Sequence, residues 1–320
     1  MKYVFGPVPS RRLGKSLGID PIPLKTCNWN CVYCQLGRTR PLTNVGREYI
    51  PRLDILTEMQ EALEAHQPGE IDWVTFVGSG EPTLHSGLGW LIRQVKRMTD
   101  LPVAVITNGA LLYLPEMRTE LAAADAVLPS LDAGNPRLYR KINRPWPKLT
   151  FERLLAGLIA FRREYTGQLW MEVMLVNGLN DTTEALQELA AAFDKIRPDQ
   201  VHLLLPVRPP AESWVQPSDA SGVRRAQDIL GAVVPVIQPD SIPEAPVTSG
   251  ANSGDLDLAI LGIVTRHPMR EDELSSVLSK WTPEEVHHTL QMLLAAGKVQ
   301  VIERFHLCFW SAADSFYQIE

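Results

Sequence analysis

Along the middle of the chain, short runs of β-branched residues alternate with longer stretches in which apolar residues recur every three or four positions. The first pattern is typical of buried strands and the second of helices with one buried face. The predicted strands are Gly18–Ile22, Asp72–Val77, Val103–Thr107, Ala126–Leu131, Leu169–Val176 and Val201–Val207. The predicted helices are Asp54–Ala65, Gly89–Met98, Pro115–Ala123, Phe151–Tyr165 and Thr183–Ile196. This alternation predicts a parallel sheet with helices outside it, in about six β/α units rather than the eight of a closed barrel.

The pattern changes after Val236. Residues 237–254 are rich in Pro, Ser, Gly and Ala without a periodic apolar pattern, which predicts a linker. Beyond it the chain predicts three helices and a hairpin, at Leu256–His267, Glu271–Leu278, Thr282–Gly297, Val299–Glu303 and Phe305–Trp310. We therefore expect an α/β protein with a partial (β/α)6 TIM-like barrel over residues 1–236 and a winged-helix-like domain over residues 255–320.

The composition narrows the class of protein. The chain has 320 residues, 45% of them hydrophobic, with a net charge of −6, which argues against a protein coated in nucleic acid. No apolar run approaches the roughly 18 residues that a membrane-spanning helix needs. The N-terminus lacks the apolar core of a signal peptide. We therefore expect a cytoplasmic protein without a membrane partner.

The cysteines point to chemistry. Three of the four, Cys27, Cys31 and Cys34, have the spacing C-x3-C-x2-C, whereas Cys308 lies far away. In a reducing compartment, such clustering indicates metal or redox chemistry rather than disulfides. Thiolates suit iron–sulfur clusters, and three of them would leave one iron of a [4Fe-4S] cubane open for a further ligand. The alternatives are a structural zinc site, for which no fourth ligand lies nearby, and buried inert thiols.

The motif, with Tyr33 before the last cysteine, resembles the signature of the radical S-adenosylmethionine (SAM) superfamily. That family folds as a partial (β/α)6 barrel, in agreement with the unit count above. The stretch Gly78-Ser79-Gly80-Glu81-Pro82 follows the second predicted strand and resembles the family's Gly-Gly-Glu-Pro element. The resemblance implies that this turn holds the methionine amino group of SAM. By itself, a Gly-Glu-Pro turn is more often a simple helix start.

Two further polar segments end predicted strands, where ligands bind in parallel α/β folds. They contain Thr107 and Asn108 after one strand, and Ser130 and Asp132 after the next. The resemblance implies that such positions contact the methionine and ribose of SAM, and that Tyr33 packs near the adenine. Ordinary turns are the alternative, since Asn-Gly is a common turn pair.

A closer resemblance covers most of the barrel. It is carried by the segments 6–14, 16–20, 80–84, 128–133 and 142–145, and it is to a bacterial and archaeal group of Fe–S oxidoreductases catalogued beside the wyosine-forming tRNA enzymes. The resemblance specifies the class of chemistry and leaves the substrate open. The wyosine enzymes carry a second cluster, which Cys308 alone cannot hold, so the resemblance extends neither to that cluster nor to the wyosine reaction.

Basic residues mark candidate substrate contacts. Residues 137–148 contain five basic side chains and no acidic one, and Arg11 and Arg12 precede the cysteine loop. Together they could receive a phosphate or a carboxylate, and Arg144 is the preferred contact. The alternative is a solvated helix face followed by a Pro-rich turn.

Two more candidates come from the last predicted strands. Strand alternation could direct Glu172 into the barrel as a polar contact or a proton-transfer group, or equally toward a partner in the core. Arg208, after the sixth strand, could lie near the ligand.

The C-terminal segment carries little positive charge. Residues 255–320 contain five Lys and Arg against ten Asp and Glu, so this segment has a net charge of −5. The predicted recognition helix has no Lys or Arg, and phosphate contacts dominate nucleic-acid affinity. We expect no DNA binding by this domain and favour a protein-contact, peptide-leader or lid role. Cys308 beside Phe309 is most simply a core thiol.

The resemblance implies a radical SAM enzyme. A [4Fe-4S] cluster, reduced by a donor such as flavodoxin or ferredoxin, would cleave SAM to methionine and a 5′-deoxyadenosyl radical that abstracts hydrogen from the substrate. The substrate candidates are RNA or a nucleoside, and a peptide or protein, including a partner that receives a glycyl radical. The alternative from another class is a non-catalytic Fe–S redox sensor that signals through the winged helix.

Overall fold

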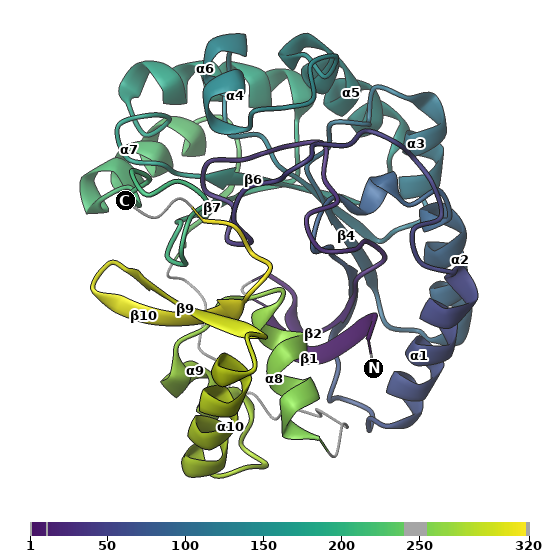
Figure 1. Cartoon of the computed structure of the whole chain (residues 1–320). Coiled ribbons are helices and arrows are strands. Elements are labelled where there is room, and N and C mark those ends of the chain that lie inside the picture. Colours follow the sequence, from purple (N-terminus) through teal and green to yellow (C-terminus); the bar gives the residue numbers. More distant parts are fainter. Residues whose placement is uncertain (1, 11, 240–254, 318–320) are drawn as a thin grey trace.

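The computed structural model describes residues 2–10, 12–239 and 255–317. Most of the predicted linker 237–254, and also Arg11, lie outside these residues. One eight-stranded sheet runs in the order β1 to β8, and helices surround its outer face (Figure 1). The sheet is curved, but its first and last strands, β1 and β8, do not pair with each other. The barrel is therefore open rather than closed.

The sheet is parallel except at its first strand. Its strands are β1 Val4–Ser10, β2 Gly14–Ile19, β3 Trp73–Phe76, β4 Val103–Thr107, β5 Ala126–Pro129, β6 Gln168–Met174, β7 Gln200–Leu204 and β8 Val236–Ile237. Strands β2 to β8 pair in parallel, and β1 pairs with β2 as an antiparallel hairpin. The alternating pattern thus located six strands. It missed β1 and β8, and the strand expected at Gly18–Ile22 begins four residues earlier.

The helices follow the strands in the expected order. They are α1 Arg52–Glu64, α2 Leu88–Met98, α3 Pro115–Leu121, α4 Pro136–Ile142, α5 Phe151–Glu164, α6 Thr183–Ile196 and α7 Ala220–Gly231, with a short 3-10 helix at Pro82–Leu84. Helices α4 and α7 were not predicted. Residues on the inner face of each long helix, such as Leu91 of α2 and Leu158 of α5, are fully buried in one core with the outer face of the sheet.

The remaining described residues, 255–317, form what we call the C-terminal unit. It contains α8 Leu256–Val264, α9 Glu271–Val277, α10 Pro283–Ala295 and the antiparallel hairpin β9 Val299–Arg304 and β10 Leu307–Ala312. The predicted capping box is present, since Thr282 and Glu285 each bond the other's backbone N–H. These elements occur where the sequence predicted them, while the winged-helix arrangement and the domain boundaries stay predictions.

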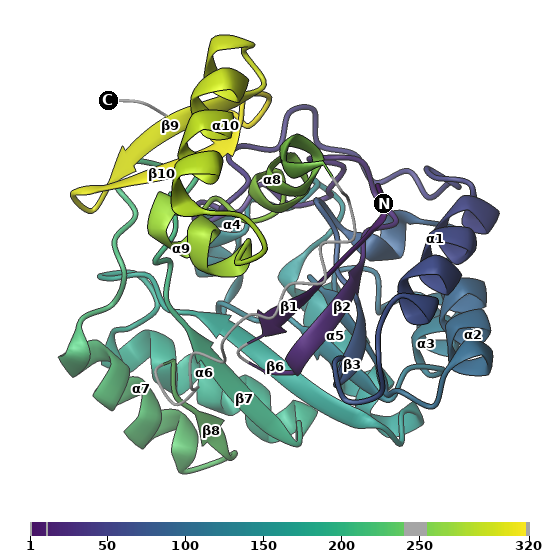
Figure 2. The same cartoon turned by 90° about the horizontal axis from the view of Figure 1, so that it is seen from below.

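The C-terminal unit has its own apolar core and lies beside β1 and β2, on the side of the barrel that helices α1 to α7 leave uncovered (Figures 1 and 2). Within the described part of the chain, no helix has both the length and the apolar character to span a lipid bilayer.

Candidate active site

The cysteine loop follows β2 and lies across the carboxyl ends of the strands. Cys27, Cys31 and Cys34 are free thiols, each partly buried. The loop is tied to the C-terminal end of α4, because Asn30 N donates to Asn143 O at 3.0 Å and Val32 N donates to Ile142 O at 2.9 Å. Residues more than 100 positions apart therefore fix its shape.

Each of the three sulfur atoms lies close to N–H groups. Lys25 Nζ is 3.2 Å from Cys34 Sγ, and Asn143 Nδ2 is 3.7 Å from Cys31 Sγ. Cys27 Sγ has Trp29 N at 3.4 Å and Asn108 Nδ2 at 3.9 Å. Donors of this kind stabilise thiolates and tune iron–sulfur clusters through hydrogen bonds to sulfur.

When no metal is present, burial favours the neutral thiols, whereas these N–H donors favour the thiolates. Burial, followed by the charge of Glu81, raises the pKa of the Cys27 thiol to about 12. Burial and the two neighbouring cysteines raise the pKa of Cys31 well above its ordinary value. A bound cation would reverse this balance by deprotonating a coordinating thiol outright.

The donor set fits a cubane better than a single ion. Among residues 2–10, 12–239 and 255–317, no three His, Cys, Asp or Glu side chains converge on one metal-ion position, as a zinc site requires. A [4Fe-4S] cluster makes no such demand, because each thiolate binds a different iron. Three cysteines surrounded by N–H donors suit that group.

The Gly78–Pro82 turn follows β3 and packs against the cysteine loop. Lys25 N donates to Ser79 O at 2.6 Å, and Glu81 N donates to Thr26 O at 2.9 Å. A Cβ atom at Gly80 would overlap the carbonyl oxygen of Thr26, so only glycine permits this approach. The sequence therefore joins turn and loop through backbone, without a gap for side chains.

Glu81 is the buried anchor of this turn, with 2% of its surface exposed. One carboxylate oxygen, Oε1, accepts from Thr83 N, Thr83 Oγ1 and Thr107 Oγ1 at 3.0, 2.5 and 2.6 Å. The other, Oε2, accepts from Asn108 N at 2.7 Å. Burial raises the pKa of Glu81, and the bonds from Thr107 and Thr83 oppose that shift. Glu81 thereby connects the turn to the end of β4.

Asp132, after β5, makes a second connection. Its Oδ2 accepts from Tyr33 Oη and from Asn143 Nδ2, both at 2.6 Å, and its Oδ1 accepts from Met174 N at 2.8 Å. Burial raises the pKa of Asp132, against these three hydrogen bonds. Ser130 is half-buried and bridges to Glu172 on β6. The structure thus brings together all the residues predicted to contact SAM.

Below this end, the barrel interior holds an ion pair. Arg12, from the β1–β2 turn, pairs with Glu172. Burial raises the pKa of Glu172, the charge of Arg12 opposes that shift, and the charge of Asp132 adds to it. His202 aligns with Glu172 on β7, and burial, aided by Arg12, lowers its pKa to about 4. Arg12 Nε and His202 Nε2 are buried and have no hydrogen-bond partner among the described residues.

The other predicted substrate contacts lie elsewhere. Arg144 and Arg38 both pair with the buried carboxylate of Glu212, which follows β7. Arg208 donates to Pro268 O and lies 3.7 Å from Glu273, both in the C-terminal unit. The guanidinium groups of Arg144 and Arg208, which were predicted to contact the substrate, thus have acidic partners within the protein.

The sequence analysis missed four site residues. Lys25, Asn143 and Asp20 contact the cysteine loop or the Gly78–Pro82 turn, and Glu212 pairs with two arginines. Asn143 and Asp20 lie inside segments that carried the closer resemblance, which was the available signal. Lys25 and Glu212 had none, because their partners are set by loop conformation.

The open, mostly parallel barrel with a three-cysteine loop at its carboxyl end defines a class of protein. The chain belongs to the radical SAM superfamily, whose family model matches residues 22–190. A solved structure of TYW1 with a lysine–pyruvate adduct has a similar fold, with a TM-score of 0.53 and 18% identity over 68% of this chain and 74% of that one.

Two relatives share more sequence. A UPF0026 protein of Methanocaldococcus jannaschii is 34% identical over 88% of this chain and 87% of its own length. A protein of Brachyspira hyodysenteriae named GTPase Obg is 38% identical over 93% of this chain, which spans 43% of that protein. The present sequence contains no Gly-x4-Gly-Lys-Ser/Thr motif, the pattern that binds nucleotide phosphates in P-loop proteins.

Proposed function

We propose that Cys27, Cys31 and Cys34 bind one [4Fe-4S] cluster and that the Gly78–Pro82 turn holds the methionine end of SAM beside it. The observation that carries the proposal is the pair of backbone hydrogen bonds between the cysteine loop and the turn. Lys25 N donates to Ser79 O, and Glu81 N donates to Thr26 O. When bound, the reduced cluster supplies one electron, which cleaves SAM to methionine and a 5′-deoxyadenosyl radical.

The chain's own residues then have definite tasks. The N–H donors of Lys25, Asn108 and Asn143 offset the negative charge of the thiolates. Glu81 fixes the turn against β4, and Asp132 fixes Tyr33, so that the cofactor site is rigid before SAM arrives. Such positioning is the protein's contribution when the cofactor supplies the difficult chemistry.

We place the substrate contacts in the barrel interior, at Arg12 and Glu172. This pair and His202 contribute buried polar atoms from three separate elements. Buried polar atoms without partners cost about 1–3 kcal/mol each, a cost that a hydrogen-bonding substrate would remove. The net charge of the pair is zero, which suits a neutral group such as a nucleobase or an amide, in keeping with both candidate substrate classes.

The test is anaerobic reconstitution with iron and sulfide, reduction with dithionite, and chromatography for 5′-deoxyadenosine after SAM is added. We expect about four irons per chain and formation of 5′-deoxyadenosine. Cys31→Ala should abolish both. Cys308→Ala is the matched control. The expectation that Cys308 is a core thiol was wrong, because this residue is exposed on β10, and its replacement should leave both unchanged.

Two results would overturn the proposal. One is normal iron loading and normal SAM cleavage in Cys31→Ala. The other is a fully loaded wild-type cluster whose electron paramagnetic resonance spectrum does not respond to SAM, which would favour the redox sensor. Glu81→Gln separates the two roles of the site, since it should weaken SAM binding while the iron content stays normal.

A further inference from the structure

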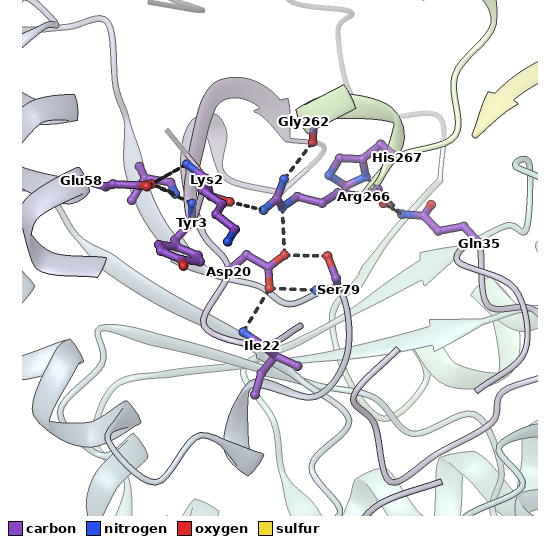
Figure 3. Close-up of polar contacts among 11 residues, drawn as sticks. Lys2, Tyr3, Asp20, Ile22, Gln35, Glu58, Ser79, Gly262, Arg266 and His267 are labelled. Carbon is purple, nitrogen blue, oxygen red and sulfur yellow. Dashed lines mark hydrogen bonds and ion pairs between the residues drawn. The ribbon is translucent and has the colours of Figure 1, made fainter. Parts of the chain in front are cut away.

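The C-terminal unit contacts the barrel at two places beside the candidate cofactor site, at Asp20 and at Gln35 (Figure 3). One contact, through Asp20, reaches Ser79 of the Gly78–Pro82 turn. The other contact is made by Gln35, which is the residue after Cys34. Arg266, just after α8, takes part in both contacts, and His267 takes part in the second, so the same short segment faces the turn and the loop together.

Asp20 is the centre of the first contact. It follows β2 and is 3% exposed. Its Oδ1 accepts from Ser79 N at 3.0 Å and from Ile22 N at 3.3 Å. Its Oδ2 accepts from Ser79 Oγ at 2.6 Å and from Arg266 Nε at 2.9 Å (Figure 3). The carboxylate therefore binds both the backbone N–H and the hydroxyl of Ser79. Among these contacts its one cationic partner is Arg266, which belongs to the C-terminal unit.

Arg266 is built into this position. Besides Asp20, its guanidinium donates to Gly262 O at 2.9 Å and to Lys2 O at 2.8 Å, and it lies 4.8 Å from the centre of the Phe5 ring. Lys2 is held in turn, because its backbone N–H donates to Glu58 of α1. A planar guanidinium used at all three nitrogens is specific for arginine, since lysine cannot reproduce the fork.

The second contact secures the chain that leaves the cysteine loop. Gln35 Nε2 donates to Arg266 O at 3.0 Å and lies 3.1 Å from His267 Nδ1. Tyr317 Oη donates to Gln35 O at 2.5 Å, and Arg38 N donates to Phe316 O at 2.6 Å. The last described residues of the chain thus run alongside the exit of the loop.

We propose that Arg266 is a positioning residue for SAM, acting through Asp20 on the Ser79 turn, so that the cofactor site is complete only while the C-terminal unit is docked. This inference rests on the proposed function. The physical reason is that removal of one partner leaves the other ion buried and uncompensated. Asp20 would then turn toward water, and the backbone N–H and hydroxyl of Ser79 would lose their common acceptor.

The test compares Arg266→Gln with wild type as full-length, cluster-loaded protein, by titration calorimetry with SAM. We expect SAM to bind at least tenfold more weakly while iron content stays normal, and the KM for SAM to rise more than kcat falls. Asp20→Asn should act in the same direction, and the double variant should be less than additive because the two residues share one interaction. Arg266→Lys should restore only part of the affinity.

Arg270→Gln is the matched control, because this arginine lies in the same unit and, among the described residues, its guanidinium pairs with its surface neighbours Asp272 and Glu273. It should bind SAM like wild type. As a readout independent of the cluster, backbone amides of residues 77–81 should exchange hydrogen faster in cluster-free Arg266→Gln than in cluster-free wild type.

The outcomes separate the two proposals. Unchanged SAM affinity in Arg266→Gln and Asp20→Asn, with a wild type that binds SAM, would overturn this inference and leave the proposed function standing. Equal loss of iron and SAM in Arg266→Gln would also overturn it, because the effect would then lie in the cysteine loop. A loaded wild type that fails to bind SAM would instead overturn the proposed function.

Discussion

The cofactor end of the barrel and its contact with the C-terminal unit are held together in different ways. At the cofactor end, groups meet because strand ends and tight turns place short sequence motifs side by side, as Gly80 does with Thr26. At the contact, Asp20 meets Arg266, which lies 246 positions away. The first arrangement follows from the order of the strands within one packed core. The second depends on the docking of two separately packed cores.

The strongest test of the first arrangement is Gly80→Ala. Its Cβ would overlap backbone, which cannot move aside like a side chain, so turn and loop must separate. We expect loss of SAM cleavage by more than about 100-fold, on the scale that an ångström of misplacement costs. The measurement is formation of 5′-deoxyadenosine by reconstituted protein.

The control for that variant is Gly231→Ala, at the end of α7, where nothing lies within 4 Å of the added Cβ atom. It should leave cleavage unchanged. Comparable cleavage by the Gly80 and Gly231 variants would show that the close approach of Gly80 to Thr26 is not needed. The close approach of turn and loop would then not explain how the cofactor end is held together.

The same contrast explains what the sequence could predict. The six strands, five helices and the elements of the C-terminal unit follow from periodic burial, which a single sequence records. Cys27 stands out by its spacing to two further cysteines, and Glu81 and Asp132 stand out because each follows a predicted strand. Lys25 does not, since it reaches Cys34 through a left-handed backbone conformation at φ 62°. Arg208 was predicted to lie near the ligand, but it contacts Pro268 and Glu273 of the C-terminal unit, whose docking the sequence did not predict.

The ion pair in the barrel interior is intermediate between these two arrangements. It joins Arg12 of the β1–β2 turn to Glu172 of β6, which are distant in sequence but belong to the same barrel. Arg12→Met would leave Glu172 buried without its cation, and breaking such a pair costs about 3–5 kcal/mol. We therefore expect a clear loss in the free energy of unfolding, measured with urea, in the presence of normal cluster loading. The double variant Arg12→Met/Glu172→Met should recover much of that loss. A neutral effect of Arg12→Met would show that the pair is not coupled to the fold.

Lys25→Met probes the cofactor end more gently. The ammonium group lies 3.2 Å from Cys34 Sγ, and a positive charge beside a cluster ligand favours the reduced, more negative state. We expect a lower midpoint potential in a redox titration followed by electron paramagnetic resonance, with iron content retained. Lys25→Arg should keep most of the wild-type value. A potential that is unchanged in Lys25→Met would place the ammonium group outside the influence of the cluster.

The smallest expected effect concerns pH and the contact with the C-terminal unit. Burial lowers the pKa of His267 to about 3, and the charges of Arg208, Arg266 and Arg12 contribute to that shift. Gln35 Nε2 can donate to Nδ1 only while this nitrogen carries no proton. The neutral histidine is therefore the form that supports docking.

The sign of the pH effect follows from the lowered pKa. In the unfolded chain His267 takes up a proton near pH 6.5, and in the folded protein only near pH 3, so the stability it contributes is complete above pH 6.5 and falls as the pH drops between these values. The slope is at most about 1.4 kcal/mol per pH unit. Urea unfolding at pH 7 and pH 5 should show a smaller difference for His267→Gln than for wild type. His288→Gln, at an exposed position of α10, should keep the wild-type difference. If His267→Gln kept it too, the acid sensitivity of the protein would arise elsewhere, and the contact at Gln35 would not depend on an unprotonated ring.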